Sequence, residues 1–187
     1  GKETLTEASP RGTGFLADVC VAWEDATRDA ERAGLRVAHA RTGVLLAANG
    51  GLLTRLLPLF RAGLGGRIGN GQQFMSWISV TDETAALSWM IDNDVAGPVN
   101  LVAPGAVTNA EFTKTLGRVL VRPTIVPMPA FAARLALGEM ADQLLLASIR
   151  VEPRQLIESG YDFRQPTLES AIRHLLGKPA YPGSDID

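Results

Sequence analysis

Cysteine is nearly absent from the sequence, with Cys20 as the only one among 187 residues. One thiol excludes an internal disulfide and any thiolate-rich zinc site, and it suits a reducing compartment, so we expect a cytoplasmic protein. Long apolar runs are absent as well, because charged residues and a glycine interrupt the apolar stretches around Leu135 and Leu144. We therefore expect no transmembrane helix and no membrane partner.

An excess of charge of either sign is also missing, since 18 Lys and Arg face 20 Asp and Glu and the net charge is −2. This balance gives no reason to expect nucleic acid as a partner. No cluster of His, Cys, Asp and Glu has the spacing of metal ligands, so we expect no metal site. What remains is a chain with 46% hydrophobic residues, long enough to bury a sizeable core. A small-molecule substrate is the expected partner, and the oligomeric state stays open.

The most informative stretch runs from Leu35 to Gly51, LRVAHARTGVLLAANGG. A short apolar run between glycines is typical of a strand buried on both faces in a parallel sheet, which predicts a strand over 35–41. The amphipathic segment before it predicts a helix over 15–33 that ends at Gly34. Helix, buried strand and Gly-rich loop form the repeating unit of a doubly wound α/β fold, in which ligands bind at the carboxyl ends of strands. We therefore expect the loop over 41–51 to face a ligand.

The rest of the chain predicts further alternating elements. The N-terminal residues 1–14 predict a loop. Later strands are expected over 74–80, 99–103 and 124–127, and helical segments over 51–62, 82–93, 108–120, 129–138, 138–148, 154–159 and 168–176. Thr81 or Asp82 is expected to cap the helix that runs to 93, and Thr108 with Glu111 to form a capping box. The strands at 35–41 and 99–103 are expected to lie parallel and adjacent, with the helix at 82–93 crossing between them.

A strand before the first helix is missing, and no G-x-G-x-x-G turn follows an early strand. Gly63, Gly65 and Gly66 come after a predicted helix, which is the wrong context for a dinucleotide-binding turn. A doubly wound fold that binds a dinucleotide normally begins with a strand and that turn. We therefore expect the chain to be a fragment of a longer protein.

Four segments carry a resemblance to a known family: RTGVLL after the predicted strand, FMSWISVTDETAAL, GPVNLVAPGAVTNAEFTKTLGRVL and GEMADQLLLASIRVEPRQLIESGYDF. In this order they resemble the epimerase branch of the extended short-chain dehydrogenase/reductases. More narrowly, they resemble the NAD(P)-dependent nucleoside-diphosphate-sugar epimerases that have their own conserved C-terminal region. The resemblance covers almost the whole chain and implies the C-terminal two-thirds of such a protein.

The resemblance implies an α/β fold, with the C-terminal part of a Rossmann-like doubly wound parallel sheet and a small mixed α/β substrate lobe. Residues 1–48 would end the NAD(P)-binding domain, 78–103 would return to its sheet, and 49–77 with 104–187 would form the substrate lobe. The implied activity is NAD(P)-dependent epimerisation or oxidoreduction of a nucleotide sugar or similar small molecule, with NADP slightly preferred. Because the turn that holds the cofactor pyrophosphate is absent, we expect this chain alone to bind NAD(P) weakly or not at all.

The Tyr-x-x-x-Lys pair that carries catalysis in the wider superfamily is absent from the helix before the strand. Aligning the chain by Glu24 places Leu16 and Cys20 at these positions, and a shift by one residue places Phe15 and Val19 there. None of the three lysines of the chain lies on this helix. Two functions therefore stay open: an enzyme, or an NADP-binding protein without turnover that regulates or binds a partner.

The candidate cofactor contacts follow from the resemblance and lie at the end of the strand at 35–41. They are Arg41 and the backbone of Thr42, Gly43 and Val44. A charged residue at the end of a buried strand needs a ligand or an internal carboxylate, so Arg41 is either a binding residue or half of a structural ion pair. Gly43 is either a contact or a residue that serves the turn.

The candidate substrate contacts form a polar and aromatic group on the loop that enters the strand at 74–80: Gln72, Gln73, Phe74, Ser76 and Trp77. Aromatic faces pack on rings and amides bind hydroxyl groups, although core packing is an equally good interpretation of Phe74 and Trp77. Arg150 and Arg154 are candidates for a diphosphate, because paired Arg donors match its oxygens.

Three further residues have a structural interpretation that we favour over a functional one. His39 lies in the predicted strand and is expected to be a core residue with one hydrogen bond. Asn109 is expected to help cap the helix that begins beside it, and Cys20 to act as a small apolar residue. No catalytic residue is assigned from the sequence.

Overall fold

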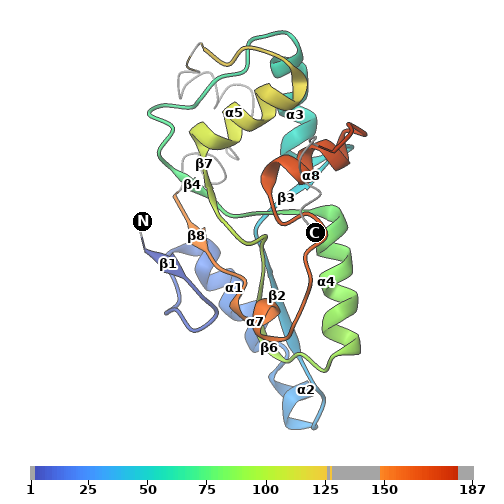
Figure 1. Ribbon diagram of the computed structural model, residues 1–187. Coiled ribbons are helices and arrows are strands. Elements are labelled where there is room, and N and C mark those ends of the chain that lie inside the picture. The colour runs from blue at the N-terminus through green and yellow to red at the C-terminus, as the bar shows by residue number, and fades with distance from the viewer. Residues whose placement is uncertain (1–2, 126, 128–147, 181–187) are drawn as a thin grey trace.

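The centre of the molecule is a parallel pair of strands with helices on both sides. The computed structural model describes residues 3–125, 127 and 148–180. Strand β2 (Ala38–Thr42) pairs with β6 (Gly97–Leu101) in parallel, from Ala38 opposite Gly97 to Thr42 opposite Leu101. In Figure 1, α1 (Phe15–Asp25) and α4 (Val80–Asp92) lie on opposite sides of this pair. The predicted adjacent parallel strands are confirmed, with α4 between them in the chain.

The segment before β2 forms two helices where the sequence predicted one over 15–33. Helix α1 ends at Asp25 and α2 (Arg28–Arg32) follows. The Thr27 hydroxyl between them donates to the Glu24 carbonyl oxygen at 2.8 Å and lies 2.8 Å from His39 Nε2. Threonine side chains that bond to nearby carbonyls compete with regular helix geometry, which explains the break.

The segment after β2, predicted as part of a ligand-facing loop over 41–51, contains a further strand. Strand β3 (Val44–Ala47) pairs in parallel with β5 (Trp77–Ser79). Gly43 separates β2 from β3, and a Cβ atom there would lie 2.8 Å from the Ser76 carbonyl oxygen. Gly43 is therefore required by the close approach of the two chain segments. Helix α3 (Gly51–Arg61) follows as predicted, with Pro58 inside it.

The segment at 68–76 lies in the upper half of Figure 1, where contacts with the start of α5 (Asn109–Leu120) and the strand before it fix its position. Strand β4 (Phe74–Met75) pairs antiparallel with β7 (Val107–Thr108), and α5 begins directly afterwards. The predicted capping box of Thr108 and Glu111 is confirmed. Asn109 does not cap α5 with its side chain; its Oδ1 instead accepts from the Ile68 amide at 2.7 Å.

The C-terminal elements match their predictions where the structure describes them. Helix α7 (Arg154–Glu158) is followed by Gly160, and Thr167 caps α8 (Leu168–Leu175). The strand predicted over 124–127 is not formed at Thr124 or Ile125. The two helical segments predicted over 129–138 and 138–148 lie outside the described residues except for Ser148.

The N-terminal segment was predicted to be a loop but contributes a strand. Strand β1 (Thr4–Leu5) pairs in parallel with β8 (Arg150–Val151). The Glu7 carboxylate reinforces the link, because its Oε1 accepts from the Asn100 amide at 3.1 Å and from the Gln155 amide at 3.2 Å. Two-residue strands carry no periodic signal in a sequence, so only the tertiary contacts reveal this pair.

Helix α4 begins at Val80, two residues before the predicted start at 82, because Ser79 is its cap in place of Thr81 or Asp82. Asp82 is fully buried and accepts hydrogen bonds from the Ser79 and Tyr161 hydroxyls and from the Arg164 and Gln165 amides. Burial, followed by the neighbouring Asp82 charge, raises the pKa of the Tyr161 hydroxyl. Asp82 therefore holds the segment at 161–165 against α4.

Two clusters of buried apolar residues divide the molecule. The lobe cluster joins α3, α5 and α8 with Leu46, Met75 and Trp77. The sheet cluster joins α4 and β6 with Ile78, Leu156 and Tyr161. Leu156 and Tyr161 pack in the sheet cluster, and the division of the chain into a cofactor domain and a substrate lobe stays a prediction. None of the described helices is both long and apolar enough to cross a bilayer.

Candidate functional site

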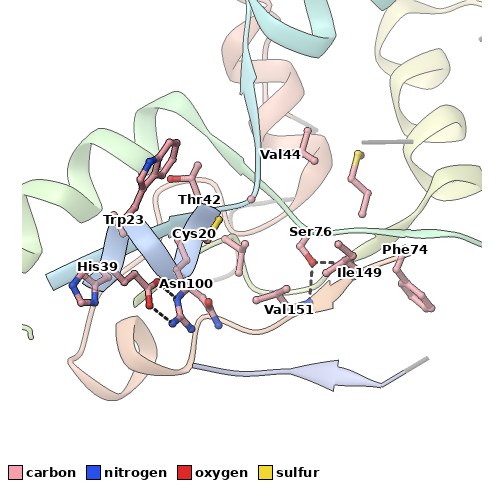
Figure 2. Close-up of a pocket in the computed structure, with 16 residues that line it drawn as sticks. Cys20, Trp23, His39, Thr42, Val44, Phe74, Ser76, Asn100, Ile149 and Val151 are labelled. Atoms are coloured by element: carbon pink, nitrogen blue, oxygen red, sulfur yellow. Dashed lines mark hydrogen bonds and ion pairs between the residues drawn. The ribbon is translucent and has the colours of Figure 1, made fainter. Parts of the chain in front are cut away.

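A cavity of about 760 Å³ opens at the carboxyl end of β2, where the sequence predicted a ligand (Figure 2). Its wall combines the end of β2 with the start of β3, the strand segment at 74–76 and β8. The segment at Arg41 and the segment at Phe74 thus meet at one cavity although they are distant in sequence. The lining residues are Cys20, Trp23, Glu24, His39, Ala40, Arg41, Thr42, Gly43, Val44, Phe74, Met75, Ser76, Asn100, Val102, Ile149 and Val151.

Arg41 forms the structural ion pair that the sequence left as one of two alternatives. Its Nε and Nη2 donate to the two carboxylate oxygens of Glu24 on α1, at 2.7 and 2.8 Å. These hydrogen bonds lower the pKa of Glu24 and raise that of the Arg41 guanidinium. Because Arg41 also lines the cavity, the ion pair orients its side chain and does not exclude contact with a ligand.

Thr42 is tied to a second carboxylate on the other side of the sheet. Its hydroxyl donates to Glu83 Oε1 of α4 at 2.8 Å, whereas Glu83 Oε2 is buried without a partner among the described residues. Burial raises the pKa of Glu83, and the bond from Thr42 opposes this effect. The two sides of the β2 end therefore hold carboxylates with pKa values shifted in opposite directions.

The backbone amides predicted to contact the cofactor already have partners. The Gly43 amide donates to the Leu101 carbonyl oxygen at 3.0 Å and the Val44 amide to the Ser76 carbonyl oxygen at 2.8 Å. A ligand at this position would meet other groups of Thr42, Gly43 and Val44. The role of these residues as cofactor contacts stays a prediction.

The predicted substrate residues separate into two groups. Phe74 and Ser76 line the cavity, whereas Trp77 is 1% exposed and packs in the lobe cluster, as its alternative interpretation proposed. The side-chain Nε2 of Gln73 donates to the Ile68 carbonyl oxygen at 3.1 Å, and Gln73 does not line the cavity. Gln72 is exposed.

The two arginines proposed for a diphosphate do not line the cavity. The Arg150 guanidinium lies 5.4 Å from the centre of the Phe74 ring. Arg154 pairs with Glu158 at 3.3 Å on the exposed face of α7. The structure does not bring Arg150 and Arg154 into a shared cavity with Arg41.

Sequence reasoning missed several lining residues, above all Asn100, Ile149 and Val151. Asn100 lies opposite Arg41 in the β2–β6 pair, so the two side chains share a face of the sheet. Its position between Val99 and Leu101 in a buried strand was the one available signal, because a buried amide needs partners. Ile149 and Val151 gave no signal, since only the pairing of β8 with β1 places them here.

His39 also lines the cavity, together with Trp23 of α1 (Figure 2). The His39 Nε2 atom lies 2.8 Å from the Thr27 hydroxyl oxygen, within hydrogen-bond distance. His39 thus has a hydrogen bond, as expected, but it lies beside the cavity. Among the described residues no group of three or more His, Cys, Asp and Glu could hold a metal ion.

Helix α1 presents an apolar face that no described residue covers. None of its residues is buried, and Phe15 and Trp23 are 80% and 72% exposed. Beside it, β2 pairs with a described strand on one edge alone, that of β6. The open face and the open edge both adjoin the end of the cavity at Trp23 and His39.

The comparisons with known proteins fit this geometry. A family model described as a domain of unknown function, DUF1731, matches residues 128–175. The chain is 48% identical over 176 residues to the epimerase family protein Mb2239 of Mycobacterium bovis; the match covers 94% of this chain and 58% of that protein. The chain therefore spans less than two-thirds of this relative, and it corresponds to the C-terminal part.

Two solved structures share the fold. The human epimerase family protein SDR39U1 (isoform 2), solved with NADPH, is 34% identical with a TM-score of 0.85, and the match covers 94% of this chain and 60% of that one. The chain is therefore similar to the C-terminal part of epimerase family proteins. The nucleoside-diphosphate sugar epimerase of Corynebacterium glutamicum is 40% identical with a TM-score of 0.75, over 95% of this chain and 34% of that one. The resemblance seen in the sequence is confirmed, as is the Rossmann-like α/β fold of the epimerase family.

Proposed function

We propose that the chain forms part of an NAD(P)-dependent epimerase or oxidoreductase that acts on a nucleotide sugar or similar small molecule. The observation that carries this proposal is the cavity at the carboxyl end of β2, where Rossmann-like folds bind their ligands. The human relative solved with NADPH supports NADP as the preferred cofactor.

The lining residues fit the nicotinamide end of such a cofactor better than its pyrophosphate end. Trp23 and His39, at the end of the cavity that adjoins the open edge of β2, offer ring faces for a nicotinamide. Within the described ranges, no glycine turn at a helix N-terminus follows a strand in the way that a pyrophosphate requires. A bound nicotinamide supplies hydride transfer, while the role of this chain is to orient the reactants and exclude water.

A second function, an NADP-binding regulatory or partner-binding protein without turnover, is favoured by one observation. Helix α1 carries no Tyr or Lys at the positions where the superfamily has its catalytic pair, and Cys20 of this helix lines the cavity. Without that pair, no described residue has an assigned role in proton transfer.

One experiment separates these functions. The chain is joined to the segment that precedes the matched region in the mycobacterial relative, and calorimetry measures NADPH binding. Product analysis then tests nucleotide sugars with NAD or NADP. NADPH binding with an epimerised or oxidised product supports the enzyme, whereas binding without any product supports the second function. Absence of binding to NADPH and NADH would overturn both.

A further inference from the structure

The cavity has two ends with different surroundings (Figure 2). One end, at Trp23 and His39, adjoins the open edge of β2. The other end lies between β3, β4 and β8, and its wall consists mainly of the apolar side chains of Val44, Phe74, Met75, Val102, Ile149 and Val151. This second end, the apolar end, is built entirely from segments that pack on one another.

The polar side chains of the wall are mostly occupied by protein partners. The Ser76 hydroxyl donates to the Ile149 carbonyl oxygen at 3.0 Å and accepts from the Val151 amide at 2.8 Å, as the dashed lines in Figure 2 show. The Thr42 hydroxyl donates to Glu83. These groups hold the wall together and have little capacity left for a ligand.

The charges of the wall cancel. Among the described lining residues, Arg41 and Glu24 are the ones with permanently charged side chains, and they form an ion pair with each other. Arg150 does not line the cavity, and its guanidinium lies 5.4 Å from the centre of the Phe74 ring. A diphosphate loses its hydration on binding and needs several cationic donors in return, whereas Arg41 is the one cation of this wall among the described residues and already pairs with Glu24.

One hydrogen-bond donor and one hydrogen-bond acceptor beside the apolar wall have capacity left for a ligand. Arg41 uses Nε and Nη2 for Glu24, which leaves Nη1 as a donor without a partner among the described residues. Asn100 uses Nδ2 for the Glu152 carbonyl oxygen, which leaves Oδ1 as an acceptor. Because Arg41 and Asn100 are paired positions of β2 and β6, the donor and the acceptor lie on the same face of the sheet.

We infer that the apolar end takes a neutral substrate with an apolar ring or chain, held through one carbonyl or hydroxyl group by Arg41 and Asn100, and not a nucleoside diphosphate. This inference rests on the proposed function, in which the cavity binds the substrate of an NAD(P)-dependent reaction. The proposed function left open whether the substrate is a nucleotide sugar or another small molecule, and this inference favours a small molecule without a nucleotide.

The test uses the whole chain with isotope-labelled Ile and Val methyl groups, because Val44, Val102, Ile149 and Val151 all line the apolar end. α-Tetralone, a neutral bicyclic ketone, and UDP-glucose are titrated separately at equal concentration and low salt. We expect α-tetralone to shift these methyl resonances and UDP-glucose to leave them unchanged. Shifts with UDP-glucose, or no shifts with α-tetralone, would overturn the inference.

Two variants locate the binding. Phe74→Ala removes a ring from the wall and is expected to raise the dissociation constant of α-tetralone about tenfold. Leu87→Ala, at a partly exposed apolar residue on α4 outside the wall, is the matched control and should leave it unchanged. Equal effects of both variants would contradict binding at the apolar end.

Failure of the proposed function is measured separately. Loss of NADPH binding by the extended chain would remove the redox role but would not change the methyl shifts that α-tetralone causes. Conversely, an extended chain that binds NADPH while only UDP-glucose shifts the methyl groups would support the proposed function and overturn the neutral substrate.

Discussion

Helices α1 and α3 have the same length, 11 residues, and both are apolar on one face, but they differ completely in burial. Helix α3 buries five residues in the lobe cluster, whereas α1 buries none. An apolar face in a sequence therefore predicts that a helix needs a partner, but not where the partner lies. The epimerase family relatives are longer than this chain, and the open face of α1 lies next to the cavity.

The largest expected effect tests this difference directly. Leu53→Ala on α3 removes a fully buried side chain and should lower the free energy of unfolding by about 3 kcal/mol. Trp23→Ala on α1 should change it by less than about 0.5 kcal/mol, because the ring is exposed in this chain. Urea denaturation of both variants gives the comparison. A large loss of stability in Trp23→Ala would mean that its face is covered.

A second prediction adds a partner to α1. When the chain is extended by the preceding segment of a relative, acrylamide quenching of Trp23 fluorescence should fall in a variant with Trp77 and Trp89 replaced by Phe. NADPH affinity should rise at least about tenfold over the chain alone, because a glycine turn at a helix N-terminus supplies much of the anion recognition. Micromolar NADPH binding by the unextended chain would contradict this expectation.

A smaller effect is expected from the ion pair of Arg41 and Glu24. Arg41→Ala should cost about 1 kcal/mol of stability, since the pair has good geometry but is partly exposed. Because Arg41 lowers the folded-state pKa of Glu24, this contribution is present above the unfolded pKa of about 4.3 and is lost as the pH falls through the folded pKa. The variant should therefore lose less stability on acidification than the parent.

Arg32→Ala, which breaks the exposed pair with Asp29, is the control and should have no measurable effect. Calorimetry with NADPH on the extended chain then decides the function of Arg41. A loss of about 1.5–3 kcal/mol of binding free energy would identify a ligand contact. Unchanged affinity with lower stability would leave Arg41 as part of the scaffold.

The smallest effect concerns Glu83, whose pKa is raised by burial. A raised folded-state pKa means that ionisation destabilises the fold, so the cost is absent below the unfolded pKa and grows as the pH rises through the folded pKa. Glu83→Gln should therefore stabilise the chain at pH 7, by less than about 1 kcal/mol because Glu83 is only half-buried, and not at pH 3. Thermal unfolding at both pH values checks this. Equal changes at the two pH values would exclude an ionisation effect.

The sequence was sufficient to predict the elements with a strong local signal. The β2–β6 pair followed from apolar runs between glycines, and the capping box of Thr108 and Glu111 marked the start of α5. The short strands at 4–5 and 150–151 were missed because they depend on contacts between residues far apart in the chain. The break at Thr27 was missed because one threonine that bonds to a nearby carbonyl does not change the apolar periodicity of the segment.

The candidate site was predictable only in part, for the same reason. Arg41 and Phe74 could be proposed from residue type and from the resemblance, but the sequence could not show that Glu24 neutralises Arg41 or that Trp77 faces the core. A strand places successive side chains on opposite faces, so either Ser76 or Trp77 could have faced the ligand until the register of β5 was known.

The pairing of β1 with β8 has a consequence for biosynthesis. Thr4 lies opposite Arg150, and the Glu7 carboxylate accepts from the Gln155 amide. Residues 4–7 therefore cannot form these contacts until the ribosome has synthesised residues 150–155. Contacts across so long a loop slow folding, because closing the loop costs entropy before the contact stabilises it. The wall formed by Ile149 and Val151 is therefore among the last parts of the cavity to assemble, after β2 and β3 have left the ribosome.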